Sequence, residues 1–181
     1  MNRRQGSIKL SRKMSKPLKF LSTSIGFREV PDEISLLINI TNCPYKCVGC
    51  HSPELWEDAG KLLDLESLQS LLLSYAYRLK SPITCITFLG DGGNLEDLGK
   101  LIEYCHKKGF LTCLYTGSTG VMNAIVASNY TLDFIKVGRY MKDMGPLDNP
   151  NTNQKFYKIH YLNKNWTLED LTYKFQNKQV Q

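Results

Sequence analysis

The sequence has no apolar run long enough to cross a membrane and no apolar segment of the kind that directs secretion. Without a secretory segment, its six cysteines are not expected to form a disulfide framework. Cys85, Cys105 and Cys113 lie inside apolar segments, where reduced cysteine packs as a small core residue. These absences predict a reduced, cytoplasmic protein with no membrane partner.

Acidic residues are absent from positions 1–19, which hold seven of the 23 basic residues. The rest of the chain then carries a net charge of −1, so the overall charge of +6 does not indicate a basic folded surface. Such a segment could contact RNA or a membrane or act as a transit peptide, but the simplest interpretation is a disordered extension, or an upstream start codon with Met14 as the true beginning. We expect residues 1–17 to be this extension, residues 18–181 to be one domain, and no nucleic-acid partner.

Three cysteines, Cys43, Cys47 and Cys50, follow the apolar segment 34–40 at C-x3-C-x2-C spacing. That segment is predicted to be a buried strand, so the cysteine loop begins at the C-terminal end of a strand, where open α/β sheets and barrels bind ligands. Three thiols cannot all be satisfied by pairwise disulfides, whereas a metal ion or a cluster can bind all three. This loop is therefore the first candidate for a functional site.

Three kinds of site compete for the loop. A structural zinc site needs four ligands, but no second cysteine or histidine pair follows, and His51 directly beside Cys50 is poorly placed to complete a tetrahedron. Residues 47–51 match the C-x-x-C-H pattern of haem attachment, which needs export to an oxidising compartment and gives Cys43 no role. An iron–sulfur cluster usually has four cysteine ligands. Three would leave one iron open to another ligand, as at reactive metal sites.

Strand-like and helix-like segments alternate after the cysteine loop. Strands are predicted at residues 18–22, 34–40, 83–89, 110–115, 132–137 and 156–162, and helices at 64–78, 95–107 and 121–127. This alternation favours a parallel sheet with right-handed crossovers, and too few strands are present to close an eight-stranded barrel. We therefore predict an α/β fold, a partial (open) (βα) barrel of about five to six mostly parallel strands.

Three local features complete the prediction. Residues 24–26 are expected to turn the first strand. Thr167 and Asp170 have the spacing of a capping box that would begin a last short helix. Residues 140–155 form a long loop, and long loops inside a compact domain are usually functional or disordered.

The cysteine loop resembles the signature of the radical S-adenosylmethionine enzymes, whose smallest members have a partial barrel. His51, Pro53 and Trp56 are similar to the small activating enzymes of glycyl-radical proteins, and Gly49 is similar to the activating proteins of anaerobic ribonucleoside-triphosphate reductase. The resemblance extends from about Leu18 to about Tyr161 and includes Asp133, Lys136, Gly138, Tyr140 and the segments 145–147 and 152–154.

The resemblance implies two cofactors. Cys43, Cys47 and Cys50 would be the metal ligands of a [4Fe-4S] cluster, whose fourth iron would bind S-adenosyl-L-methionine. The residues implied around this cofactor are Gly49, Cys50, His51, Gly90, Asp91, Gly92, Tyr115, Thr116, Gly117 and Lys136. From the residues alone, Asp91 could equally cap a helix, Tyr115 could be a half-buried strand residue, and Lys136 could point to solvent. No catalytic side chain beyond the cluster and the cofactor is implied.

The activity that the resemblance implies is reductive cleavage of S-adenosylmethionine to generate a glycyl radical on a partner protein. Anaerobic ribonucleoside-triphosphate reductase is the expected protein substrate, and a small electron-donor protein such as a flavodoxin is the expected reductant. So short a chain leaves little room for an enclosed substrate pocket, which also favours a macromolecular substrate. The alternatives are an activase of another glycyl-radical enzyme, of the pyruvate formate-lyase type, and a non-catalytic iron–sulfur or zinc binding module.

Overall fold

The computed structural model describes residues 16–78, 82–162 and 165–176. Its strands are β1 (Lys19–Gly26), β2 (Ser35–Ile40), β3 (Lys61–Leu62), β4 (Cys85–Leu89), β5 (Leu111–Tyr115), β6 (Phe134–Val137), β7 (Lys155–Leu162) and β8 (Asn165–Asp170). Its helices are α1 (Leu65–Arg78), α2 (Leu95–Lys107), α3 (Val121–Ala127), α4 (Tyr173–Gln176) and the 3-10 helix η1 (Pro53–Trp56). The extension predicted for residues 1–17 lies outside the described residues, apart from the exposed Lys16 and Pro17.

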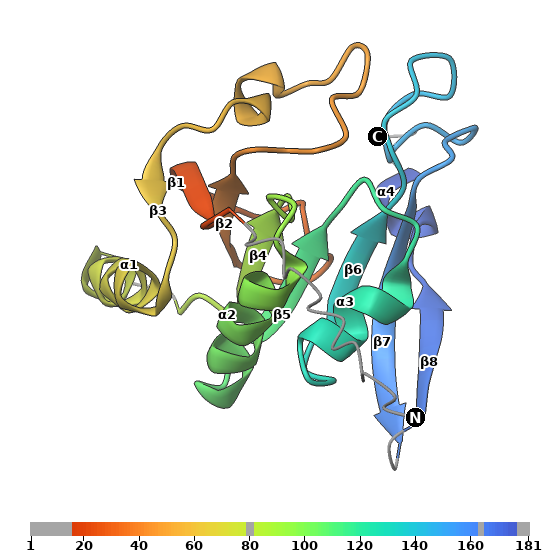
Figure 1. Cartoon of the computed structure of the whole chain (residues 1–181). Coiled ribbons are helices and arrows are strands. Elements are labelled where there is room, and N and C mark those ends of the chain that lie inside the picture. Colours follow the sequence, from red (N-terminus) through yellow and green to blue (C-terminus); the bar gives the residue numbers. More distant parts are fainter. Residues whose placement is uncertain (1–15, 79–81, 163–164, 177–181) are drawn as a thin grey trace, which may run out of the picture.

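The strands form one mixed sheet in the order β3-β1-β2-β4-β5-β6-β7-β8 (Figure 1). Strands β2, β4, β5 and β6 are parallel, while β1 and β3 on one side and β7 and β8 on the other pair antiparallel. The predicted α/β class is confirmed. The predicted five to six mostly parallel strands are corrected to eight strands with four antiparallel and three parallel pairings. Parallel pairing needs a long crossover, and the β1–β2 and β7–β8 links are too short for one.

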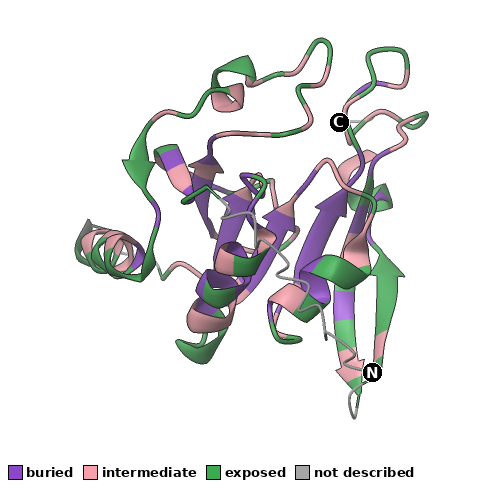
Figure 2. Cartoon of the chain, in the orientation of Figure 1, coloured by how far each residue is buried: buried purple, intermediate pink, exposed green. Residues whose placement is uncertain are grey.

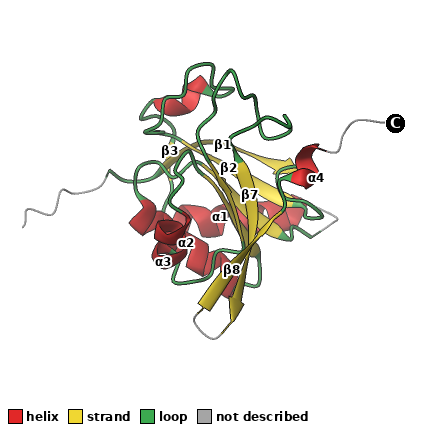
Figure 3. Ribbon diagram, turned by 90° about the vertical axis from the view of Figure 1, so that its right-hand side faces the viewer, coloured by secondary structure: helices red, strands yellow, loops and turns green. Residues whose placement is uncertain are grey.

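The central strands are buried along most of their length (Figure 2). Their alternate residues belong to two cores, one on each face of the sheet. The larger core contains Ile86, Phe88 and Leu114 and packs against α1, α2 and α3. The smaller core contains Phe134 and Phe156 and lies near α4. Figure 3 shows α2 and α3 on one face of the sheet and α4 on the other. Burial on both faces explains why the central strands are almost continuously apolar in sequence.

The helix boundaries follow local capping signals. Asp64 precedes α1, and its Oδ1 accepts a hydrogen bond from the N–H of Ser67 at 2.9 Å. Asn94 caps α2 in the same way, and Gly109, with a φ of +86°, follows the C-terminal end of that helix. The predicted helices 64–78, 95–107 and 121–127 are thereby confirmed to within a residue. No helix within the described ranges is long and apolar enough to span a membrane.

Two local predictions are wrong. Residues 24–26 continue β1 and pair with β2, so the turn begins only after Gly26. Thr167 and Asp170 lie in β8, where Thr167 is opposite His160 of β7, rather than at the start of a helix. The backbone N–H groups of this segment form hydrogen bonds with β7, so they need no side-chain cap. The last helix, α4, begins three residues after β8.

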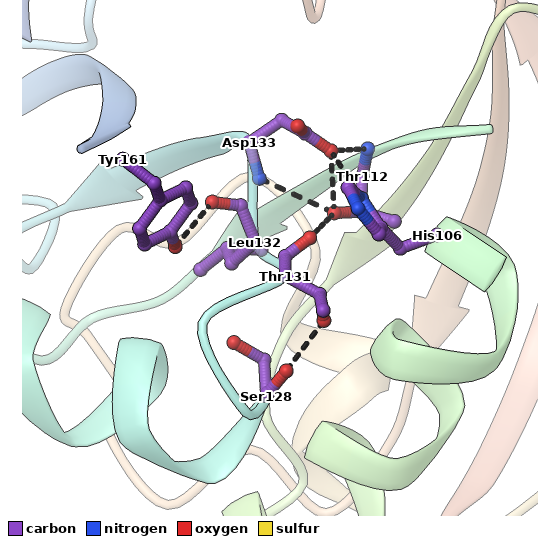
Figure 4. A network of polar contacts seen from close by, with 7 residues as sticks. All are labelled: His106, Thr112, Ser128, Thr131, Leu132, Asp133 and Tyr161. Carbon is purple, nitrogen blue, oxygen red and sulfur yellow. Dashed lines mark hydrogen bonds and ion pairs between the residues drawn. The ribbon is translucent and has the colours of Figure 1, made fainter. Parts of the chain in front are cut away.

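A polar network joins α2, β5 and β6 at the N-terminal end of the parallel strands (Figure 4). Asp133 Oδ2 accepts a hydrogen bond from the N–H of Thr112 at 2.8 Å, and Thr112 Oγ1 and His106 Nδ1 lie 3.0 Å and 3.6 Å from the same oxygen. Beside it, Tyr161 Oη donates to the carbonyl of Leu132 at 2.8 Å. Asp133 therefore links α2, β5 and β6. Because it precedes β6, it lies at the end of the sheet opposite the cysteine loop.

Candidate metal and cofactor site

One row of side chains crosses the central strands near their C-terminal ends. The register places Asn39 beside Leu89, Leu89 beside Tyr115, and Tyr115 beside Lys136. Residues paired in this way point to the same face of a sheet. The residues that alternate with them belong to the core beneath α1, α2 and α3. The row therefore lies on the face that these helices leave uncovered.

The cysteine loop connects β2 to β3 and is closed at its base by hydrogen bonds. The N–H of Asn42 donates to the carbonyl of Glu57, and the N–H of Cys43 donates to the carbonyl of Leu55, each at 3.0 Å. The buried Thr41 adds a side-chain hydrogen bond of 2.7 Å to the carbonyl of residue 59. Residues 44–54 thus project from a hydrogen-bonded base between the end of β2 and the start of β3.

A cavity of about 260 Å³ lies between the cysteine loop and the strand ends. Eight predicted site residues line it: Cys43, Cys47, Cys50, Gly90, Tyr115, Thr116, Gly117 and Lys136. They come from the cysteine loop and from the ends of β4, β5 and β6. Gly90 has a φ of +111°, and a Cβ there would lie 3.2 Å from the carbonyl oxygen of Ile40, so glycine permits the close approach of β2 and β4. The fold brings together residues that are far apart in the sequence.

Lys136 is a buried cation in this cavity, with 9% of its surface exposed. Its Nζ donates to the carbonyl of Gly138 at 2.9 Å, and none of the ion pairs among the described residues includes it. Desolvation lowers the pKa of Lys136 to about 8. A buried ammonium without an anionic partner is unfavourable, so the cavity favours an anionic ligand group.

The three cysteines of the loop are the type of ligand that binds a metal ion or an iron–sulfur cluster. All three loop cysteines are free, partly buried thiols, and desolvation raises the pKa of Cys43. The indole N–H of Trp56, buried beside the same cavity, donates to no acceptor in the described part of the chain. Within that part, no group of three or more His, Cys, Asp or Glu side chains is close enough to hold a metal ion. Ligation by all three cysteines therefore requires their sulfur atoms to move closer together.

The other predicted site residues, Gly49, His51, Asp91 and Gly92, are not among the residues that line this cavity. His51 is exposed, and so is Gly49, whose φ of +73° places it in the left-handed region. Gly92 is buried, and a Cβ there would lie 2.9 Å from Leu18 and 3.0 Å from Ile40. Glycine at position 92 is thus required by packing.

Asp91 faces a second cavity, of about 250 Å³. Its Oδ2 accepts hydrogen bonds from Thr116 Oγ1 at 2.6 Å and from Tyr45 Oη at 3.0 Å, and its Oδ1 accepts the N–H of Gly93 at 3.0 Å. The helix-cap alternative for Asp91 is wrong, because Asn94 caps α2. The carboxylate instead links the cysteine loop to the ends of β4 and β5.

Several residues of the site were not predicted. Asn39 lines the cavity. Gln154, which the sequence marked only as part of the segment 152–154, also lines it and is buried, with its Nε2 3.4 Å from the carbonyl of Gly138. A polar residue inside the apolar segment 34–40 was a usable signal for Asn39. Tyr45 and Arg139 gave no signal, because their roles depend on contacts between distant segments.

No protein-family model, curated protein or solved structure matches this chain.

Proposed function

We propose that the chain is an iron–sulfur radical-SAM activase, an oxidoreductase that reductively cleaves S-adenosylmethionine to generate a glycyl radical on anaerobic ribonucleoside-triphosphate reductase. One observation carries the proposal. The three cysteines and five of the residues expected around S-adenosylmethionine line a single cavity at the C-terminal ends of parallel strands. Those five are Gly90, Tyr115, Thr116, Gly117 and Lys136. Ligands of open α/β sheets bind at this position.

In this proposal, Cys43, Cys47 and Cys50 hold a [4Fe-4S] cluster. When bound, the cluster and S-adenosylmethionine supply the one-electron chemistry that removes a hydrogen atom from a glycine Cα. The Lys136 ammonium, buried without a carboxylate partner, binds the carboxylate of S-adenosylmethionine by charge. The Trp56 N–H provides a hydrogen-bond donor that no described acceptor uses. In this proposal, the face of the sheet opposite α1, α2 and α3 is the inner face of a partial, open barrel.

The segment between β6 and β7 is the proposed docking surface for the reductase. It lies at the same end of the sheet as the cysteine loop (Figure 1), and its Arg139 and Tyr140 line the cavity. Asn153 Nδ2 donates to the carbonyl of Arg139 at 3.0 Å, so Asn153 holds the conformation of the segment. Gln154 is buried and belongs to the cavity rather than to a surface. We propose a cytoplasmic location and a flavodoxin-like electron donor on the same basis of resemblance.

The first experiment tests the cluster. Anaerobic reconstitution with iron and sulfide is expected to give a brown protein with about four irons per chain. Single replacement of Cys43, Cys47 or Cys50 with Ala abolishes the broad visible absorption or makes it unstable, whereas Cys105→Ala retains it. A colourless protein with one tightly bound zinc ion contradicts the proposal and supports a structural metal module.

The second experiment tests the substrate. The reconstituted chain with reductant is expected to cleave S-adenosylmethionine slowly and to form no radical of its own. Added reductase acquires a doublet electron-paramagnetic-resonance signal, and Asn153→Ala weakens its formation more than it weakens cluster binding. If pyruvate formate-lyase acquires an equal signal, the alternative of an activase for that type of enzyme is favoured instead. Cleavage with no radical on either protein contradicts a glycyl-radical function.

A further inference from the structure

Tyr45 belongs to the cysteine loop but is anchored outside it. Its hydroxyl donates to Asp91 Oδ2 at 3.0 Å and lies 3.3 Å from Thr116 Oγ1. The single Thr116 hydroxyl proton goes to the shorter contact, which is the 2.6 Å hydrogen bond to Asp91 Oδ2. Asp91 therefore accepts from both hydroxyls and from the N–H of Gly93 at 3.0 Å. Hydrogen bonds to a charged acceptor are the stronger kind, so Tyr45 ties the loop firmly to the ends of β4 and β5.

The ring of Tyr45 makes two further contacts with the strand ends. A Cβ at Gly117, which follows β5, would lie 2.6 Å from Cγ and Cδ2 of the ring, so the ring packs directly on that backbone. The Arg139 guanidinium carbon, just after β6, lies 5.2 Å from the ring centroid, within cation–π distance. The phenol thus contacts the segments that follow three of the four central strands.

Few other side chains could replace this anchor. Among the described residues of the loop, Asn42 donates to the carbonyl of Gly92 at 3.3 Å, but it lies at the closed base. Between Cys43 and Cys50, Tyr45 is the residue whose side-chain hydrogen bonds reach the sheet. Tyr45 and Thr116 are also the two residues that line both the 260 Å³ and the 250 Å³ cavities. The phenol therefore forms part of the wall between them.

We propose that Tyr45 is a positioning residue that holds the three cysteines over the larger cavity through Asp91 and Thr116, and that it keeps the two cavities apart. The anchoring of the loop by Tyr45 is proposed for the protein without any bound group and does not depend on the proposed function. Its consequence for cluster binding rests on the proposed function. Asp91 acts in this scheme through Tyr45, from the side of the wall that the cysteines do not face.

The test compares Tyr45→Phe, which removes only the hydroxyl, with Tyr161→Phe as a matched control. The Tyr161 hydroxyl also makes one hydrogen bond, to the Leu132 carbonyl at 2.8 Å, but at the opposite end of the sheet. In cluster-free protein, maleimide labelling of each cysteine is followed by peptide mass spectrometry. Tyr45→Phe is expected to accelerate labelling of Cys43 about tenfold, as loss of one hydrogen bond to a charged group gives, with Cys85 unchanged. The control is expected to leave Cys43 labelling unchanged.

A double-mutant cycle separates positioning from general destabilisation. If the hydroxyl acts through the carboxylate, the accelerations caused by Tyr45→Phe and by Asp91→Asn combine in the double variant to less than the product of the two single effects. Additive effects, or equal acceleration in Tyr161→Phe, overturn the proposal. In reconstituted protein, Tyr45→Phe is expected to lose iron to a chelator about tenfold faster than wild type, consistent with the same lost hydrogen bond.

The two proposals fail in different ways. Accelerated labelling in Tyr45→Phe together with no iron bound by wild type supports the anchor and contradicts the proposed function. A stable cluster in wild type with unchanged labelling and unchanged iron loss in Tyr45→Phe contradicts the anchor and leaves the proposed function intact.

Discussion

Thr116 Oγ1 donates a 2.6 Å hydrogen bond to Asp91 Oδ2, which joins the end of β5 to the turn after β4. Thr116 is 6% exposed and Asp91 is 7% exposed, so the bond is shielded from water. The buried Asp91 carboxylate therefore holds the ends of β4 and β5 and the cysteine loop in fixed positions relative to one another.

Asp91→Ala is expected to lower the free energy of unfolding by about 1–3 kcal/mol, because it leaves the buried Thr116 hydroxyl without its acceptor. Urea denaturation of the cluster-free protein measures this change. Asp143→Ala, at an exposed position of the β6–β7 segment, is the control and should shift stability by less than about 0.5 kcal/mol. Equal effects of the two substitutions would contradict a structural role for Asp91.

The six thiols are expected to divide into two reactivity classes. Cys85, Cys105 and Cys113 are fully buried, and desolvation raises the pKa of Cys85 and of Cys105 to about 12 and that of Cys113 well above its usual value. Because the thiolate is the reactive form, iodoacetamide at pH 8 should modify these three only in denaturant. Cys43, Cys47 and Cys50 should be modified in the native protein. Mass spectrometry of the peptides checks the division, and early modification of Cys113 would refute it.

Lys136 predicts a pH dependence of the cluster-free protein. Its pKa is lowered from 10.5 to about 8 by desolvation, so between these values the unfolded chain binds more protons than the folded one. Stability relative to Lys136→Met should therefore be constant below pH 8 and rise by roughly 3 kcal/mol between pH 8 and 10.5. Urea denaturation of both proteins at pH 7, 8, 9 and 10 measures the difference. A difference that stays flat with pH would show that the ammonium is not desolvated.

Deleting residues 1–13 is expected to leave the melting temperature unchanged, because this segment has no apolar periodicity with which to join a core. Leu18→Ala is the contrasting substitution. Leu18 is 3% exposed and belongs to the larger core, so truncation should cost about 2–5 kcal/mol. Circular dichroism melts of both variants give the comparison. A large fall in melting temperature on deletion would mean that the segment packs on the domain.

The sequence was most informative where a single local cause decides the structure. Strands β4, β5 and β6 are buried on both faces, so they are short continuous apolar segments. Asp64, Asn94 and Gly109 carry helix-end signals that need no tertiary information. The three cysteines marked the loop by spacing alone.

The rest depends on register, which no local pattern contains. The row from Asn39 to Lys136 exists because four strands align at one level, and a shift of one residue would turn every member to the other face. Strand β8 is exposed along most of its length, so its residues lack the apolar alternation of a half-buried strand. The proposed role of Tyr45 depends on its hydrogen bond to Asp91, which lies 46 residues away in the sequence.

The hydrogen bonds that close the base of the cysteine loop do not involve the cysteine side chains. Thr41, Asn42 and Cys43 are tied to residues 55–59 before the loop projects, so the sheet is complete without anything bound between the cysteines. Segments joined to a domain in this way open locally at lower free energy than the domain unfolds. Amide hydrogens of residues 45–50 should therefore exchange with solvent long before those of β4 and β5. If the proposed cluster is bound, the chain can fold first and receive it afterwards, through a local opening of the loop that leaves the sheet intact.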